Sequence, residues 1–192
     1  MVRISSGRLK GRKVATSKKI FSSPEGDELR PTSSKVREAI FNILQTEIGE
    51  SLFLDLYAGT GAVGLEALSR GAERVFFVEN NPVRSRAITD YISRLGLESK
   101  AAVYQETAEA FLKRAMRSGM KFDIIFADPP YLSDEIMKVL PYVAEHDLLK
   151  AGGCVLAEYS SKEVLPENMH DVKRIKNYKY GDTMITLYRK EE

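Results

Sequence analysis

The chain has 192 residues, of which 43% are hydrophobic, and its 29 basic and 27 acidic side chains nearly cancel. This length fits one domain with one core, and the ordinary composition excludes a fibrous or wholly disordered protein. One cysteine, Cys154, and two histidines exclude a disulfide framework and a cysteine-based zinc site, so we expect no metal. The sequence shows neither a signal peptide nor an apolar run of the roughly 20 residues that a membrane helix needs, and we expect a cytoplasmic protein without membrane contact.

The positive charge is concentrated at the N-terminus. Residues 1–20 hold seven basic side chains and no acidic one, and subtracting these seven from the overall net charge of +2 leaves −5 for the rest of the chain. Such a segment on an acidic body indicates an arm that contacts polyanions, although a solvated tail has the same composition. Residues 2–5 and 12–15 are compatible with strands separated by Gly7 and Gly11, which predicts a basic β-hairpin. We therefore expect an arm and a loop over residues 1–28 and the main domain over residues 29–192.

The main domain opens with a predicted helix over residues 32–44, because apolar residues recur there at helical spacing behind a run of capping hydroxyl side chains. Strands and helices then alternate. The expected strands are 52–57, 74–79, 101–104, 122–127 and 153–159, and the expected helices are 63–70, 82–95, 108–117 and 133–145. Residues 172–178 and 183–188 indicate a closing antiparallel hairpin. This order predicts an α/β fold with a mostly parallel, seven-stranded sheet and helices on both faces.

A glycine-rich loop follows the first strand of the main domain. The pattern Gly59-x-Gly61-x-x-Gly64 allows a tight turn and lets a ligand approach the start of the next helix. Glu79 ends the second strand twenty positions after Gly59, where a carboxylate can accept hydrogen bonds from both ribose hydroxyls. This pattern is the fingerprint of a dinucleotide site, but an S-adenosylmethionine site fits it as well, with Asp55 and the loop carbonyls as acceptors for the cofactor ammonium.

The fourth strand runs into Asp128-Pro129-Pro130-Tyr131. The first and fourth strands flank the switch point of a doubly wound sheet, so this corner should face the glycine loop. Two prolines stiffen the backbone and remove two donors, which leaves carbonyls and the Asp128 side chain as acceptors for an exocyclic amine. Tyr131 can stack on a nucleobase that has been extruded from its helix. A proline-stiffened turn without a function would have the same residues.

Several segments together resemble the RsmD-type methyltransferases, which transfer a methyl group from S-adenosylmethionine to the N2 amine of a guanine in bacterial 16S ribosomal RNA. The segments are ISSGRLKGRK at 4–13, LRPT at 29–32, VREAIFN at 36–42, GLEALSRGA at 64–72 and DPPY at 128–131. The resemblance covers nearly the whole chain. It implies the Rossmann-like fold of class I methyltransferases, S-adenosylmethionine as cofactor, and 16S rRNA or an assembling small ribosomal subunit as partner of a monomeric enzyme.

The resemblance also implies the functional residues. The catalytic set is Asp128, Pro129, Pro130 and Tyr131, and the cofactor set is Asp55, Tyr57, Ala58, Gly59, Gly61, Glu79, Asn80, Thr107, Ala108 and Asp128. The residues expected to contact RNA are Arg3, Arg8, Lys10, Arg12, Lys13, Arg30, Thr32 and Arg37. For Arg30 and Arg37, a contact with the cofactor carboxylate or a pair with Glu38 or Glu47 stays open. Thr107 departs from the family, in which Asp or Asn commonly faces the adenine amine at this position.

Four other functions remain compatible with parts of the sequence. Adenine N6 in DNA and a glutamine amide in a protein would both fit the amine-binding corner, although the basic arm favours nucleic acid. An NAD(P)-dependent oxidoreductase would use the glycine loop, but it has no need for the Asp-Pro-Pro-Tyr corner. A non-catalytic RNA-binding module would explain the arm and not the corner.

Overall fold

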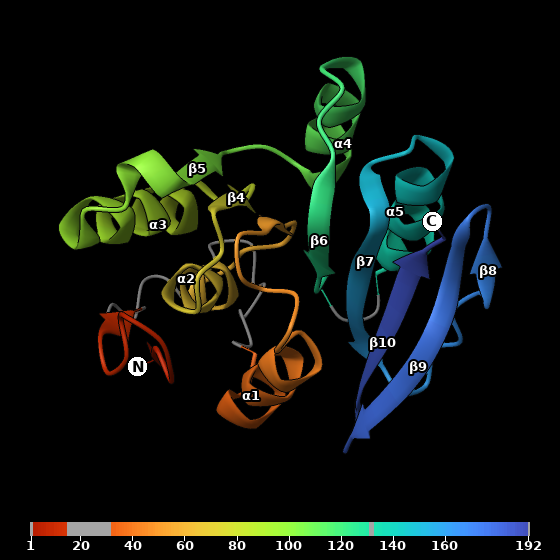
Figure 1. Cartoon of the computed structure of the whole chain (residues 1–192), viewed down its shortest axis with the longest axis horizontal. Coiled ribbons are helices and arrows are strands. Elements are labelled where there is room, and N and C mark those ends of the chain that lie inside the picture. The colour runs from red at the N-terminus through yellow and green to blue at the C-terminus, as the bar shows by residue number, and fades with distance from the viewer. Residues whose placement is uncertain (1, 15–31, 131–132, 192) are drawn as a thin grey trace.

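The structure, a computed structural model, describes residues 2–14, 32–130 and 133–191 (Figure 1). Its main sheet has eight strands in the order β5-β4-β3-β6-β7-β10-β9-β8, and the first five strands are parallel. The strands are β3 Leu52–Asp55, β4 Arg74–Val78, β5 Ala101–Tyr104, β6 Phe122–Ala127, β7 Leu149–Ser160, β8 Asn168–Met169, β9 Val172–Tyr180 and β10 Thr183–Lys190. The predicted mostly parallel α/β sheet is confirmed.

Three predicted details of the sheet are wrong. The sheet has eight strands instead of seven, because the two-residue strand β8 pairs with β9 and is too short to leave a pattern in the sequence. β7 begins at Leu149 instead of residue 153, and its pairing with β6 is irregular near Phe122. β3 ends at Asp55, because Ala58 donates its backbone N–H to Val78 in β4 and the chain turns out of the strand, so Tyr57 lies in the loop.

Helices cover both faces of the sheet, as predicted. They are α1 Ser34–Ile43, α2 Ala62–Ser69, α3 Pro82–Leu95, α4 Ala108–Arg117 and α5 Glu135–Glu145, with a short 3-10 helix η2 at Glu98–Lys100. Buried residues of α1, α2 and α3 form one apolar cluster with one face of the sheet, and buried residues of α4 and α5 form a second cluster with the other face. None of the helices described is long and apolar enough to span a membrane.

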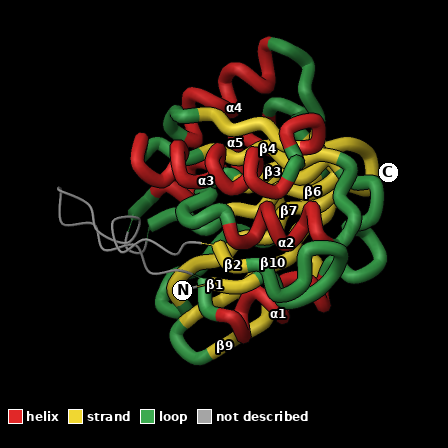
Figure 2. Tube along the Cα trace, turned by 90° about the vertical axis from the view of Figure 1, so that its left-hand side faces the viewer, coloured by secondary structure: helices red, strands yellow, loops and turns green. Residues whose placement is uncertain are grey.

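A small two-stranded sheet, β1 Val2–Arg3 and β2 Lys13–Val14, confirms the predicted N-terminal hairpin. Figures 1 and 2 show it against α2. Ile4 and Val14 are buried in the apolar cluster that contains α1 and α2. At Gly7, which has a φ of +77°, a side-chain Cβ would lie 1.9 Å from the carbonyl oxygen of Ser69, so only glycine lets the hairpin lie this close to the end of α2. The described part of the arm is therefore packed on the main domain.

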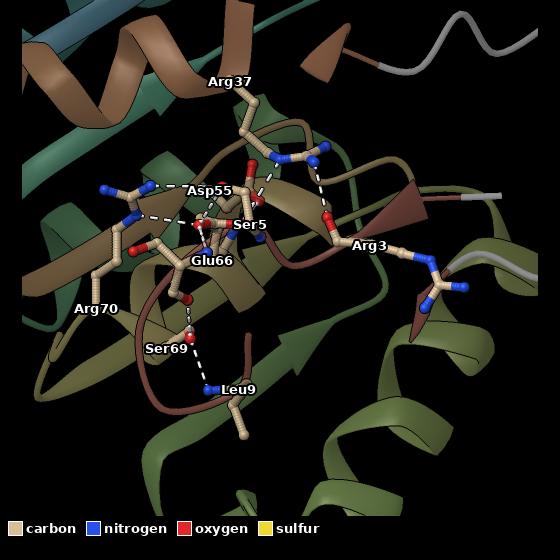
Figure 3. A network of polar contacts seen from close by, with 10 residues as sticks. Arg3, Ser5, Leu9, Arg37, Asp55, Glu66, Ser69 and Arg70 are labelled. Atoms are coloured by element: carbon tan, nitrogen blue, oxygen red, sulfur yellow. Dashed lines mark hydrogen bonds and ion pairs between the residues drawn. The ribbon is translucent and has the colours of Figure 1, made fainter. Parts of the chain in front are cut away.

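A buried carboxylate holds the hairpin in place (Figure 3). Glu66 in α2 has no exposed surface and accepts hydrogen bonds from the backbone N–H groups of Ser5 at 2.7 Å and Ser6 at 2.9 Å. It also accepts from the Ser5 hydroxyl at 2.7 Å. Two cations neutralise its charge, the Arg70 Nε at 3.0 Å and the Arg37 Nε at 3.8 Å. A buried carboxylate is stable only with such partners, so α2 and the hairpin depend on each other.

The substitution Glu66→Ala should destabilise the protein by about 3–5 kcal/mol, because it leaves the buried Arg37 cation unpaired and two hairpin amides without an acceptor. Chemical denaturation measures the loss, and amide hydrogen exchange at Ser5 and Ser6 should accelerate. The control Glu109→Ala removes an exposed pair with Lys113 and should change the stability little, because solvent screens exposed ion pairs. Equal effects of the two substitutions would contradict this role of Glu66.

Candidate active site

A cavity of about 420 Å³ opens at the carboxyl ends of β3, β4 and β6. This is the place where open α/β sheets bind ligands, and the volume suits a small molecule. Its walls come from the glycine loop, the end of β4, the turn before α4 and the start of the Asp-Pro-Pro corner. β3 and β6 pair directly, since Leu56 donates its N–H to the carbonyl of Phe126 at 3.0 Å. The two predicted motifs therefore face one cavity.

The glycines of the loop have different roles. Gly59 and Gly61 have positive φ values of 53° and 73°, which only glycine adopts without strain, and Gly61 is the N-cap of α2. Gly64 is needed for packing, because an added Cβ would lie 2.2 Å from the ring of Phe77 in β4. Gly61 packs on Ile88 and, alone in the predicted cofactor set, does not line the described cavity.

Glu79 connects the end of β4 to the glycine loop. It is buried, and its two carboxylate oxygens accept hydrogen bonds from the backbone N–H groups of Gly59 and Asn81, both at 2.8 Å. A carboxylate can accept about four hydrogen bonds. Glu79 therefore holds the glycine loop in shape and places its carboxylate at the cavity wall, where a ribose hydroxyl can donate to it.

Two aspartates with raised pKa values lie in the cavity. Asp55 is 1% exposed and accepts a hydrogen bond from the N–H of Gly64 at 2.9 Å. Burial, aided by the charges of Asp128 and Glu79, raises the pKa of Asp55 to about 7. Burial also raises the pKa of Asp128 to about 7, against the opposing effect of a hydrogen bond from the Thr32 hydroxyl at 3.1 Å. The cavity thus gathers negative charge that a cationic ligand would stabilise.

The turn before α4 contains a carboxylate that the sequence analysis missed. Thr107 caps α4, because its hydroxyl accepts from the N–H of Ala110 at 3.2 Å. The preceding residue, Glu106, lines the cavity, and its Oε1 atom is buried without a hydrogen-bond partner in the described structure. Its Oε2 atom accepts from Arg114 at 2.8 Å. A buried acceptor without a partner is costly, which indicates that a ligand donor completes this site. In the sequence, Glu106 is marked only by its position next to Thr107, and the family pattern points to Thr107.

The remaining predicted site residues are distributed as follows. Tyr57, Ala58, Asn80, Thr107, Ala108, Pro129 and Pro130 all line the cavity. Burial and the nearby Glu135 carboxylate raise the pKa of Tyr57. Arg3, Arg8, Lys10, Arg12 and Lys13 are exposed on the hairpin. Arg30 and Tyr131 lie outside the described residues.

Two residues predicted to contact RNA have other partners. Arg37 is 4% exposed, faces Glu66 and donates to the carbonyl of Arg3 at 2.8 Å, so its guanidinium is used inside the fold. Among the described residues, Arg37 forms no pair with Glu38 or Glu47, and Glu47 accepts from Arg189 instead. The same pairs suggested for Arg30 stay a prediction. Thr32 lies in the cavity and donates to Asp128. Both roles depend on contacts between residues far apart in the chain, which a local motif does not reveal.

The cavity fits S-adenosylmethionine. A cationic amino acid group matches the buried carboxyl of Asp55, ribose hydroxyls match the carboxylate of Glu79 at the cavity wall, and an adenine amine matches the unpaired oxygen of Glu106. Among the described residues, no group of three or more His, Cys, Asp or Glu side chains could hold a metal ion.

Comparisons with known proteins agree with this assignment. The model of the family "Conserved hypothetical protein 95", the RsmD family, matches residues 2–189. The "Ribosomal RNA small subunit methyltransferase D" of Haemophilus influenzae is 34% identical over 170 residues, 87% of this chain and 84% of that protein. Its Escherichia coli namesake is 28% identical over 190 residues, 99% of this chain and 90% of that protein. The solved structure titled "Putative methyltransferase yhhF", also from Escherichia coli, superposes with a TM-score of 0.82 at 28% identity and covers 99% of this chain and 98% of its own.

The fold, the cavity and these matches lead to one assignment. The match of the family model spans the hairpin, the glycine loop and the Asp-Pro-Pro corner alike. The chain belongs to the RsmD family of S-adenosylmethionine-dependent ribosomal RNA methyltransferases.

Proposed function

We propose that this protein transfers a methyl group from S-adenosylmethionine to the exocyclic N2 amine of a guanine in 16S rRNA of the small ribosomal subunit. The observation that carries the proposal is the position of Asp128, held by Thr32, in the same cavity as Asp55 and Glu79. Donor and acceptor can therefore meet in one site. The names of the relatives and the exposed basic hairpin support ribosomal RNA as the substrate.

The residues of the corner account for the chemistry at the amine. S-adenosylmethionine supplies a methyl group on a positively charged sulfur. An aromatic amine is a weak nucleophile because its lone pair is delocalised into the ring. Asp128 and the proline-stiffened backbone can accept hydrogen bonds from both amine hydrogens and so favour a pyramidal nitrogen. As the new N–C bond forms and the S–C bond breaks, the nitrogen releases a proton, and a carboxylate with a pKa near 7 is suited to take it.

The alternative substrates predict different products in one experiment. Labelled S-adenosylmethionine is incubated with the protein and, separately, with naked 16S rRNA, small subunits that lack the modification, and DNA. The proposal predicts label in the RNA of one or both ribosomal substrates and none in DNA. Label in DNA alone would favour the adenine N6 alternative, and the absence of label from all three substrates would contradict the proposal.

Removal of the Asp128 carboxylate should affect turnover far more than cofactor binding, since it acts on the transition state. We expect Asp128→Ala to lower turnover at least about 100-fold, the scale for one preorganised polar group. Affinity for S-adenosylhomocysteine, measured by calorimetry, should change little. The control Asp134→Ala removes an exposed carboxylate nearby and should retain full activity. Near-native turnover of Asp128→Ala would remove this residue from the reaction.

The raised pKa of Asp55 makes cofactor binding dependent on pH. A cationic ammonium favours the charged carboxylate, so binding below pH 7 must release the proton that the free protein holds there. Affinity for S-adenosylhomocysteine should therefore rise from pH 6 to pH 8. Calorimetry in two buffers with different ionisation heats should detect proton release at pH 6, and Asp55→Asn should abolish it. Proton release that persists in Asp55→Asn would assign the effect to another group.

The same burial changes the stability of the free protein. A folded-state pKa above the unfolded value means that Asp55 binds a proton on folding between about pH 4 and pH 7, so its contribution to stability is lost as pH rises through 7. Asp55→Asn should thus stabilise the free protein at pH 8 relative to the parent, and less so at pH 5. This comparison by denaturation is independent of ligand binding.

We further propose that Glu106, in place of Thr107, accepts a hydrogen bond from the adenine amine. The test compares S-adenosylhomocysteine with its inosine analogue, in which a carbonyl oxygen replaces that amine. The parent should prefer the amine by at least about tenfold, and Glu106→Ala should lose most of this preference, because a buried acceptor penalises a ligand without the donor. The control Glu109→Ala, at an exposed position, should keep the parent's preference for S-adenosylhomocysteine over the inosine analogue. An unchanged preference in Glu106→Ala would exclude the contact.

A further inference from the structure

A second concave surface lies outside the cofactor cavity, between α1 and β9. Its α1 wall contains Lys35, Glu38, Ala39, Asn42 and Ile43, and its β9 wall contains Tyr178 and Tyr180. We call it the α1–β9 groove. Figures 1 and 2 show α1 next to the lower part of β9. The function proposed above does not use these residues.

The groove combines aromatic rings with cations. Tyr178 and Tyr180 are half-buried against the apolar cluster, so each ring is held in place and keeps some exposed surface. Lys176 lies on the same face of β9, two residues from Tyr178, with its Nζ atom 5.1 Å from the centre of that ring. Lys35 is exposed on the opposite wall. Rigid rings flanked by ammonium groups are the features that bind single-stranded nucleic acid.

The charges in the groove are available to a ligand. Farther along β9, Lys173 pairs with Glu191 and Arg174 pairs with Glu167, so these two cations are neutralised. Lys35 and Lys176 form no ion pair with any of the described residues. Glu38 is the one acidic residue among the described residues of the groove. Two unpaired lysines beside exposed ring surface suit a polyanion with flat bases better than an apolar protein surface.

The groove begins at the mouth of the active site. Thr32, which donates to Asp128, precedes α1 by two residues, and Lys35 is the second residue of that helix. On the other wall, the turn after Tyr180 lies at the carboxyl end of β7, because Thr183 pairs with both Tyr180 and Ser160. β7 neighbours β6, and β6 leads into Asp128. With a rise of about 1.5 Å per residue, the stretch from Lys35 to Asn42 extends roughly 10 Å away from the cavity.

We infer that the α1–β9 groove binds the single-stranded RNA that flanks the target nucleotide, with Tyr178 and Tyr180 stacking on bases and Lys35 and Lys176 contacting phosphates. The inference rests on the proposed RNA substrate and adds a second contact surface to the basic hairpin. When a nucleotide is extruded into an active site, the nucleotides joined to it on either side lie near the entrance of that site. A groove that begins beside Asp128 is placed to receive them.

The test measures the affinity for a fluorescent single-stranded RNA of mixed sequence across a salt series. The double variant Tyr178→Ala, Tyr180→Ala should bind at least about tenfold more weakly with an unchanged salt slope, because stacking involves no counterion release. The double variant Tyr178→Phe, Tyr180→Phe should bind like the parent, since the rings remain. Lys35→Ala with Lys176→Ala should lower the log–log salt slope by about 1.4, or 0.7 for each phosphate contact.

Matched controls lie far from the groove. Tyr142→Ala replaces a half-buried tyrosine on α5, and Lys100→Ala replaces an exposed lysine near β5; both should leave RNA affinity and salt slope unchanged. Affinity for S-adenosylhomocysteine should stay the same in all variants, which also reports that the cofactor domain is intact.

Groove variants with the parental RNA affinity and salt slope would overturn the inference. Variants that bind naked RNA normally but lose methylation of small subunits would overturn it as well, because a ribosomal protein would then be the occupant. Failure of the proposed function has a different signature, since the parent protein would then methylate no ribosomal substrate at all, whatever the groove variants do in the binding assay.

Discussion

The arrangement of the molecule depends on the direct pairing of β3 with β6. The two strands run in parallel at the centre of the sheet, and their carboxyl ends stop at the same edge. The chain leaves β3 toward the glycine loop and leaves β6 toward Asp128, and this divergence opens the cavity. The carboxylates of Asp55 and Asp128 are consequently brought together and buried, and this burial raises both pKa values. A site of this kind favours a cationic cofactor and an amine as its ligands.

Helix α2 connects this site to the parts of the molecule that we propose to contact the substrate. It begins at Gly61 in the cofactor loop, and its buried Glu66 holds both the N-terminal hairpin and Arg37 of α1. The hairpin presents the basic side chains, while α1 carries one wall of the groove and follows Thr32 beside Asp128. The proposed RNA-contacting surfaces and the cofactor loop are thus fixed relative to one another through the buried carboxylate of Glu66. Arg37, which the resemblance suggested as an RNA contact, pairs with this carboxylate instead.

The sequence predicted the features that local patterns encode. Strand and helix alternation, the glycine loop and the Asp-Pro-Pro corner follow from residue spacing, and the structure confirms their positions to within a few residues. The features that it did not predict depend on contacts between distant residues. Arg37 could be assigned only once Glu66 was seen beside it, and Glu106 only once its unpaired oxygen was seen in the cavity. Strand β8 is formed by pairing with β9 and has no pattern of its own.

In the proposed function, Asp128 and the prolines after it select an exocyclic amine. Nucleoside analysis of 16S rRNA after methylation by the purified protein tests this selection, because mass spectrometry with chromatographic standards separates the isomers of methylated guanosine. We expect N2-methylguanosine as the product. Methyl groups on a guanine ring nitrogen or on a ribose hydroxyl would exclude the proposed selection, since neither acceptor presents two amine hydrogens to Asp128 and the carbonyls of the corner.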